Sequence, residues 1–261
     1  MGGSLQGRSA LVTGAGRGIG RGIAEELAAR GAAVGLTYRA DDRAAAEAVE
    51  AIEAGGGSAV AIRASMTDPD EVGALAATAL ERLGHVDLLV HNAGMASRGR
   101  HVADTEAREV LSVMTAHALG AHRLTAALLP ELRRHGRADV IAISSSEVGV
   151  HRAGGAPYGM AKAALEELTL TLAREEAVSG IRANIVAPGL TVTDMGAKLV
   201  AAKLGIDDMT ALDAGQPFGR VCRPRDIARV VAFLASDDAT MVTGQRIVVD
   251  GGADAFPDDA G

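Results

Sequence analysis

Short apolar runs rich in β-branched residues alternate along the chain with longer stretches of helical periodicity. In the longer stretches apolar residues recur one helical turn apart, as at Ile23 and Leu27. Repeated strand–helix order predicts an α/β fold, a doubly wound parallel sheet with helices on both faces. The predicted strands are Ala10–Thr13, Ala33–Tyr38, Ala59–Arg63, Val86–Val90, Val140–Ile143, Ile181–Val186 and Arg246–Val249.

No Pro- or Ser-rich linker interrupts this alternation, so residues 1–261 are predicted to form a single domain with its core at about 7–252. The least regular segment is Thr191–Arg220, in which Gly and Pro are scattered. We expect a loop or lid there that shapes a pocket.

Composition narrows the class of protein. The net charge of −7 gives no reason to expect nucleic acid or an anionic membrane as a partner. The single Cys222 cannot form an internal disulfide, which fits a reducing cytoplasm. The sequence shows no signal-peptide pattern and no apolar run of about 18 residues. A soluble cytoplasmic protein is therefore expected, and the scattered histidines predict no metal site.

A glycine-rich segment, TGAGRGIG, runs from Thr13 to Gly20 between the first predicted strand and the first helix. Gly14 permits a tight turn, Gly18 lets the backbone approach a pyrophosphate, and Gly20 allows the helix to pack closely on the strand. The free N–H groups and the helix dipole favour a phosphate at this position. The segment predicts a dinucleotide site that includes Ile19.

The end of the second predicted strand indicates which dinucleotide binds. An enzyme that uses NAD is expected to place a carboxylate here for the ribose 2′-hydroxyl. The chain has Arg39 instead, with Arg17 inside the glycine-rich segment. Guanidinium groups suit a 2′-phosphate, so NADP(H) is the expected cofactor. The alternative is that both arginines are ordinary solvated side chains.

Five motifs in order resemble those of the short-chain dehydrogenases/reductases. TGAGRGIG has the family's T-G-x-x-x-G-x-G spacing, and VDLLVHNAG (86–94) resembles its N-N-A-G element with His91 replacing the first Asn. The others are Tyr158-x-x-x-Lys162, Pro188-Gly189 followed by Thr193, and Phe233–Gly252, which is similar to the 3-oxoacyl-carrier-protein reductase branch. The resemblance implies a Rossmann sheet of seven parallel strands, assembled as homodimers or homotetramers through two long helices.

Tyr158 and Lys162 lie four residues apart in a strongly helical stretch, so their side chains share one face. A nearby ammonium, helped by the positive nicotinamide of the oxidised cofactor, stabilises a phenolate and is expected to lower the Tyr158 pKa. Tyr158 would then donate a proton during reduction or accept one during oxidation. The family resemblance adds that Lys162 also holds the nicotinamide ribose.

The resemblance also implies a serine that orients the substrate oxygen, at the end of the fifth strand. The usual gap to the tyrosine selects Ser145, although a shifted Gly149 leaves Ser146 open, and the other serines are expected to cap backbone groups. The family's relay asparagine is replaced by His117. His117 either relays protons, since histidine titrates near neutrality, or serves only in helix packing.

Further cofactor contacts are implied near the adenine and the nicotinamide. Ser65 stands where the family often has an aspartate beside the adenine. The remaining implied contacts are Met66, Asn92, Ala93, Gly94, Pro188, Gly189 and Thr193.

These observations favour an NADPH-dependent ketoreductase acting on a small carbonyl substrate, such as a 3-oxoacyl thioester or a polyketide-like intermediate. A basic loop, Arg98–His101, can meet an anionic substrate or form a solvated edge. Two other hypotheses stay open: an oxidative alcohol or steroid-type dehydrogenase, and a dinucleotide-binding sensor that has lost catalysis.

Overall fold

Seven parallel strands form one sheet in the computed structural model, which describes residues 4–253. Their spatial order is β3-β2-β1-β4-β5-β6-β7, which reverses direction between β1 and β4. The predicted doubly wound α/β fold is confirmed. The strands are β1 (Ser9–Val12), β2 (Ala33–Tyr38), β3 (Ser58–Arg63), β4 (Leu88–His91), β5 (Ala138–Ile143), β6 (Ile181–Pro188) and β7 (Arg246–Val249).

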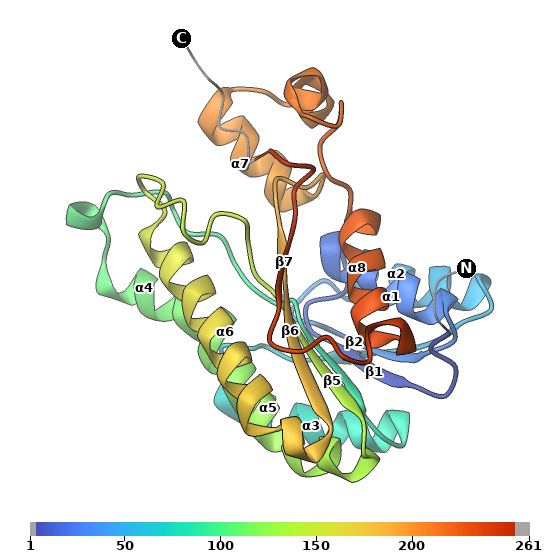
Figure 1. The fold of residues 1–261 in the computed structure, drawn as a ribbon. Coiled ribbons are helices and arrows are strands. Elements are labelled where there is room, and N and C mark those ends of the chain that lie inside the picture. The colour runs from blue at the N-terminus through green and yellow to red at the C-terminus, as the bar shows by residue number, and fades with distance from the viewer. Residues whose placement is uncertain (1–3, 254–261) are drawn as a thin grey trace.

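Helices cover both faces of this sheet (Figure 1). One layer contains α1 (Gly18–Ala29), α2 (Asp42–Ala54) and α8 (Pro224–Ala235). The other contains α3 (Pro69–Leu83), α4 (Ala107–Met114), α5 (Gly120–Leu132) and α6 (Ala156–Glu175). Within the first layer, a Cβ on Gly22 would lie 2.8 Å from the Pro224 side chain, so glycine permits the close approach of α1 and α8.

The predicted strands differ from the observed ones by at most two residues at each end. The shift at an N-terminus reaches two residues at β5, which begins at Ala138 instead of Val140, and at β4, which begins at Leu88 instead of Val86. The preceding Asp87 uses its carboxylate to accept hydrogen bonds from the Ser9 backbone N–H (2.9 Å) and from Arg8 Nε (2.5 Å). The apolar pattern alone cannot show that Asp87 lies just before the strand and not within it.

The segment Thr191–Arg220 is largely helical, so the expectation of an irregular loop was wrong, whereas that of a lid that shapes a pocket stays a prediction. It contains α7 (Asp194–Leu204) and a 3-10 helix at Met209–Gly215. Val200 of α7 packs with Met209 and Val221 in a small apolar cluster of its own. Figure 1 shows α7 beyond the carboxyl ends of the strands, where a pocket wall would stand.

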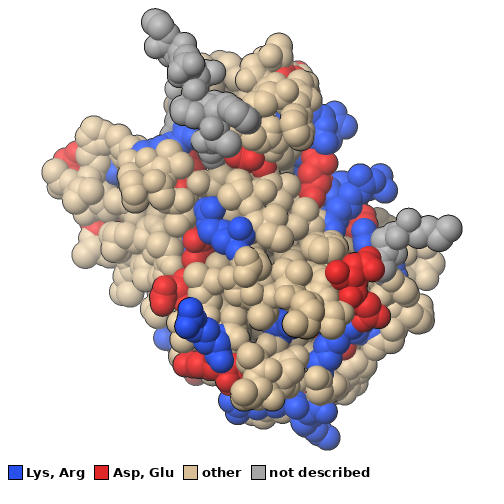
Figure 2. Space-filling view, in the orientation of Figure 1, with Lys and Arg blue, Asp and Glu red and all other residues tan. Residues whose placement is uncertain are grey.

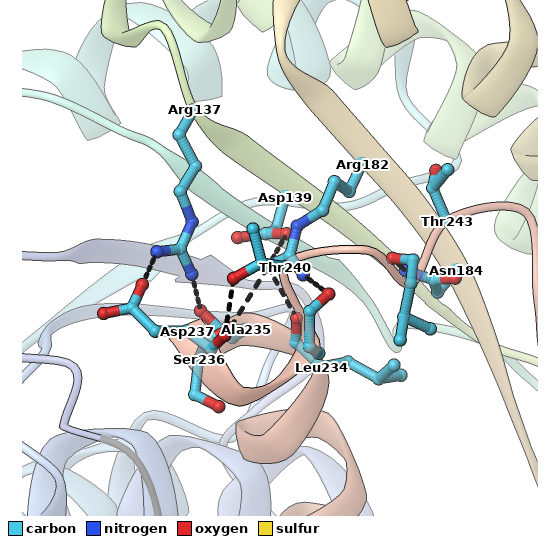
Figure 3. Close-up of polar contacts among 12 residues, drawn as sticks. Arg137, Asp139, Arg182, Asn184, Leu234, Ala235, Ser236, Asp237, Thr240 and Thr243 are labelled. Carbon is cyan, nitrogen blue, oxygen red and sulfur yellow. Dashed lines mark hydrogen bonds and ion pairs between the residues drawn. The ribbon is translucent and has the colours of Figure 1, made fainter.

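Arginine side chains gather at the opposite edge of the sheet, near the amino ends of the strands. Arg182 and Arg137 lie beside Asp139 and converge on the C-terminal end of α8 (Figure 3). This buried polar cluster lies away from the carboxyl ends of the strands.

The surface in the view of Figure 2 mixes positive and negative side chains over broad uncharged areas. No helix within residues 4–253 is both long and apolar enough to cross a membrane. In the same range, no group of three or more potential His, Cys, Asp or Glu ligands is arranged to hold a metal ion.

Candidate active site

The carboxyl ends of β1, β4, β5 and β6 bring the sequence motifs to one edge of the sheet. This is the edge at which open α/β sheets bind ligands, where the strand order reverses. The glycine-rich turn follows β1, the Asn92–Gly94 segment follows β4, and three serines follow β5. Motifs far apart in the sequence therefore form one site.

The glycine-rich turn has the geometry of a phosphate cradle. Gly14 and Gly18 have φ values of 64° and 58°, which L side chains rarely adopt. A Cβ on Gly20 would lie 2.5 Å from the Gly14 carbonyl oxygen and would clash with the Asn92 amide. The N-terminus of α1 has no side-chain cap and no acidic residue in its first turn, so its N–H groups are free to bind an anion. These features fit the pyrophosphate of a dinucleotide.

Asn92 supports this turn from the neighbouring strand. Its Nδ2 donates to the carbonyl oxygens of Thr13 and Gly14, both at 2.9 Å. The Thr13 hydroxyl in turn accepts from the backbone N–H groups of Asn92 and Ala93, each at 3.0 Å. The side-chain amide of Asn92 thus fixes the glycine-rich turn, and its predicted place along the cofactor stays a prediction.

Tyr158, Ser145 and Lys162 meet beneath this loop. The Ser145 side chain interacts with the Tyr158 phenol, and Lys162 Nζ lies 5.7 Å from the centre of the Tyr158 ring. Lys162 is buried and donates to the Ile143 carbonyl oxygen at 2.6 Å. Tyr158 is only half-buried, so its hydroxyl is placed where a substrate oxygen could reach it.

The charge states of this group differ from expectation. Burial raises the pKa of Tyr158 to about 12, against the lowering effect of the Ser145 hydrogen bond. The net shift of the Tyr158 pKa in the protein alone is therefore upward, and the lowering by Lys162 together with the oxidised nicotinamide stays a prediction. Burial also lowers the pKa of Lys162 to about 7, against the raising effect of the Glu166 charge.

His117 lies on one turn of π-helix, Thr115–Leu119, between α4 and α5. Its ring packs edge-on against Tyr158, with 5.5 Å between centroids, and fills the space that a side chain on Gly94 would need. Burial, with a contribution from Lys162, lowers the pKa of His117 to about 3. The expected titration near neutrality is thus wrong, and the ring is neutral.

The His117 ring keeps one polar atom unused. Nε2 lies 3.0 Å from the Met95 backbone nitrogen and 2.8 Å from the Met95 carbonyl oxygen. Nδ1 has no hydrogen-bond partner in the described structure. Turns of π-helix often mark functional sites. Periodicity could not reveal this one, because a single extra residue barely disturbs the apolar pattern.

The other two serines have different surroundings. Ser144 is buried and its hydroxyl donates to Glu166 Oε1 at 2.5 Å, so the prediction of a backbone cap was wrong for this residue. Ser146 donates its backbone N–H to the Pro188 carbonyl oxygen, and its hydroxyl faces Gly189. The contact with Tyr158 belongs to Ser145 and favours it over Ser146 as the orienting residue.

The remaining predicted contacts surround the site at various depths. Thr193 places its methyl group against Gly18 and uses its hydroxyl to cap α7 by accepting from the Gly196 N–H at 3.0 Å. Arg39 is exposed at the end of β2, and Arg17 is 3.8 Å from Asp194 with both side chains largely exposed. Met66 is buried, whereas Ser65 is half-buried and bonds to Thr67.

Two charged residues behind the site were missed by the sequence analysis. Glu166 lies one helical turn beyond Lys162, and Arg246 reaches it from β7 with a 2.9 Å ion pair. The spacing of four residues between Lys162 and Glu166 was a signal for Glu166, since such pairs share a helix face. Nothing in the sequence pointed to Arg246, 80 residues away from Glu166.

Comparison with known proteins identifies the family. A sequence profile described as enoyl-(acyl carrier protein) reductase matches residues 14–254. The chain is 38% identical to the 3-oxoacyl-[acyl-carrier-protein] reductase of Staphylococcus aureus, over 94% of this chain and 97% of that one. The chain therefore belongs to the short-chain dehydrogenase/reductase family and is an oxidoreductase.

Solved structures show the same fold with bound dinucleotides. A short-chain dehydrogenase from Burkholderia cenocepacia in complex with NADP has a TM-score of 0.86 and 34% identity, covering 96% of this chain and 99% of that one. A 7α-hydroxysteroid dehydrogenase complexed with NADH and 7-oxo glycochenodeoxycholic acid has a TM-score of 0.88 and 31% identity, covering 95% of each chain. Neighbours of this fold thus occur with either dinucleotide.

Proposed function

We propose that the protein is an NADPH-dependent ketoreductase, with Tyr158, Ser145 and Lys162 as its catalytic residues. The observation that carries the proposal is the convergence of Tyr158, Ser145 and Lys162 beside the glycine-rich turn, with Lys162 Nζ 5.7 Å from the centre of the Tyr158 ring. A protonated phenol is ready to give a proton to the oxygen of a ketone as it is reduced. Oxidation of an alcohol would need the phenolate, which burial disfavours.

When bound, the nicotinamide supplies the hydride, and the protein supplies position and charge. The Gly14–Gly20 turn and the N-terminus of α1 would hold the pyrophosphate. Pro188, Gly189 and Thr193 would lie towards the nicotinamide, Ser65 and Met66 towards the adenine, and Ile19, Ala93 and Gly94 along the dinucleotide. Each of these residues lies at the edge of the sheet where the motifs meet.

Tyr158 and Ser145 act on the substrate oxygen in this proposal. The Ser145 hydroxyl orients the carbonyl oxygen, and the Tyr158 hydroxyl donates the proton as negative charge develops there. The protonated fraction of Lys162 stabilises the phenolate that remains. Neutral His117 fixes the Tyr158 ring from the side and leaves the proton transfer to Tyr158.

The preference for NADPH rests on Arg39 and Arg17. Both guanidinium groups are exposed near the carboxyl ends of β2 and β1, where the adenosine ribose of a dinucleotide would lie. A 2′-phosphate takes paired hydrogen bonds from such groups, whereas a ribose 2′-hydroxyl prefers a carboxylate. The NADH complex of the hydroxysteroid dehydrogenase makes NAD the competing cofactor.

Arg39→Asp is expected to reverse the cofactor preference. The variant loses charge-assisted bonds to the 2′-phosphate, so kcat/KM for NADPH should fall by about tenfold or more. The new carboxylate can accept from a 2′-hydroxyl, so kcat/KM for NADH should rise. Steady-state kinetics with both cofactors measures this. Arg82→Asp, an equal charge change in the last turn of α3, is the control. An unchanged ratio in Arg39→Asp would make Arg39 an ordinary surface residue.

The experiment that tests the function is a panel of ketones with NADPH. It includes 3-oxoacyl thioesters, simple 3-oxo esters and steroid ketones, with the matching alcohols and NADP⁺ or NAD⁺ run in parallel. We expect ketone reduction with NADPH to be the fastest reaction. Faster alcohol oxidation with NAD⁺ would favour the dehydrogenase alternative. Cofactor binding without turnover on any compound would favour the sensor.

A further inference from the structure

The loop that carries Ser145 is held by hydrogen bonds from Arg246, which lies on β7. Arg246 lies on β7, the edge strand, and its Nη2 donates to the Ser145 carbonyl oxygen at 2.9 Å. The same nitrogen lies 3.5 Å from the Val148 carbonyl oxygen. A side chain that reaches from the sheet edge to these two carbonyls fixes the path of the loop after β5.

Glu166 holds both the arginine and the loop. Its Oε1 accepts from Arg246 Nε at 2.9 Å and from the Ser144 hydroxyl at 2.5 Å. Glu166 is buried, so its carboxylate needs hydrogen-bond donors, and these two groups supply them. Glu166 and Arg246 thus form one ion-paired unit that contacts Ser144 and Ser145.

Together with Lys162, this unit fixes the loop at four points. Lys162 binds the Ile143 carbonyl oxygen, Glu166 binds the Ser144 hydroxyl, and Arg246 binds the carbonyl oxygens of Ser145 and Val148. Between these points the Ser145 hydroxyl meets Tyr158. Because a displacement of about 1 Å at a reacting group can cost about 100-fold in rate, this restraint bears directly on turnover.

We propose that Glu166 and Arg246 are positioning residues for the reaction, holding Ser145 against Tyr158 and placing a partly neutralised negative charge one helical turn from Lys162. The inference rests on the ketoreductase function proposed above. Neither side chain contacts the expected position of the substrate. They act through Ser145 and Lys162.

The electrostatic part of this role follows from what surrounds Lys162. Tyr158 and Glu166 lie on its own helix, His117 lies on the π-helix turn, Glu147 lies near Tyr158 in the loop after β5, and Arg246 lies behind Glu166. His117 is neutral, so Glu166 is the charge that raises the Lys162 pKa against burial. Arg246 weakens the effect of Glu166 by pairing with it.

Two substitutions should therefore move the pH profile in opposite directions. Glu166→Gln keeps an acceptor for Ser144 and Arg246 but removes the charge. Lys162 then loses its proton at lower pH, and the alkaline limb of kcat/KM should shift down by about 1 pH unit. Arg246→Gln leaves the Glu166 charge without its partner, so the limb should shift up. The assay is reduction of ethyl acetoacetate, a simple 3-oxo ester, by NADPH between about pH 5 and pH 9.

The positioning role predicts a separate effect on turnover. The Arg246→Gln variant loses the contacts with the carbonyl oxygens of Ser145 and Val148. We therefore expect kcat to fall by about tenfold with little change in KM. Arg246→Lys can still pair with Glu166 but cannot reach both carbonyl oxygens. It should restore the position of the alkaline limb while leaving kcat low. A residue that mattered only for folding would not separate these two readouts.

Glu167→Gln is the matched control, because it removes the same charge from an exposed position on the same helix. It should leave the profile unchanged. Tyr158→Phe, assayed alongside, separates the two proposals. Wild-type protein that reduces neither the ester nor any other ketone of the panel, or a Tyr158→Phe variant as fast as wild type, would overturn the proposed function and this inference with it. A slow Tyr158→Phe variant together with unshifted limbs, or limbs shifted the same way, would overturn only this inference.

Discussion

Tyr158→Phe is expected to lower turnover by at least ~100-fold, the scale of lost general-acid catalysis. The substitution removes one oxygen atom and keeps the ring that packs against His117. The Ser145 hydroxyl loses its contact with the Tyr158 hydroxyl but still accepts from the Glu147 backbone N–H at 3.2 Å. The glycine-rich turn and the N-terminus of α1 are unchanged. Affinity for NADPH should therefore survive, and kcat should carry the loss.

The measurement combines steady-state kinetics with NADPH binding followed by cofactor fluorescence. Tyr38→Phe is the matched control, since Tyr38 is the other tyrosine of the chain and lies at the end of β2. It should retain most of the activity. If Tyr158→Phe kept near-normal turnover, the assignment of Tyr158 as the proton donor would be wrong.

The fold and the composition of the site were accessible from the sequence for physical reasons. Buried parallel strands are largely apolar, and the run at Ala33–Tyr38 matches the observed strand residue for residue. The run at Arg246–Val249 matches as well, although that strand is only partly buried at the edge of the sheet. The glycine-rich turn needs residues that tolerate positive φ, which is why Gly14 and Gly18 were readable before any coordinates.

The parts that were missed depend on burial and on contacts between distant segments. Burial raises the pKa of Tyr158 and lowers the pKa of His117, because both groups lose water on folding. The spacing of residues in the sequence does not reveal how deeply a group is buried. Ser144 donates to Glu166, 22 residues away, and Arg246 of β7 donates to Ser145, 101 residues away in the sequence. Only the tertiary structure brings these groups together.

Misjudging Thr191–Arg220 has a local cause. Gly196 lies inside α7 because a side chain there would clash with the Thr191 carbonyl oxygen and approach Met209. A glycine inside a helix costs stability relative to alanine and reads as a loop in the sequence. The Thr193 cap, which accepts from the Gly196 N–H, was the helix signal that this glycine obscured.

The second large effect is expected at the opposite edge of the sheet, where Arg182→Met should destabilise the fold by about 3–5 kcal/mol. Arg182 is buried and pairs with Asp139 at 2.6 Å. It also donates to the carbonyl oxygens of Leu234, in the last turn of α8, and of Ser236 and Ala239, just beyond that turn (Figure 3). Methionine fills a similar volume but satisfies none of these acceptors.

The cost should exceed that of one ordinary hydrogen bond because Arg182 satisfies three carbonyl oxygens and one carboxylate at once. Arg8 donates to Asp139 and to the Ala235 carbonyl oxygen, and Arg137 donates to the same carbonyl oxygen. These cations face the negative end of the α8 dipole, where positive charge is stabilising. Without Arg182, Asp139 keeps Arg8, but several buried carbonyl groups lose their only described side-chain donor.

Denaturant unfolding and calorimetry of Arg182→Met test this, and the midpoint of thermal unfolding should fall by about 10 °C. Arg43→Met is the control, because it removes an arginine that pairs with Glu47 at 3.6 Å on the surface. It should change stability by no more than about 0.5 kcal/mol. KM for NADPH should stay unchanged in Arg182→Met below its unfolding temperature, because the cluster and the cofactor site lie at opposite edges of one sheet. A stability equal to that of Arg43→Met would mean that water replaces the arginine at the end of α8.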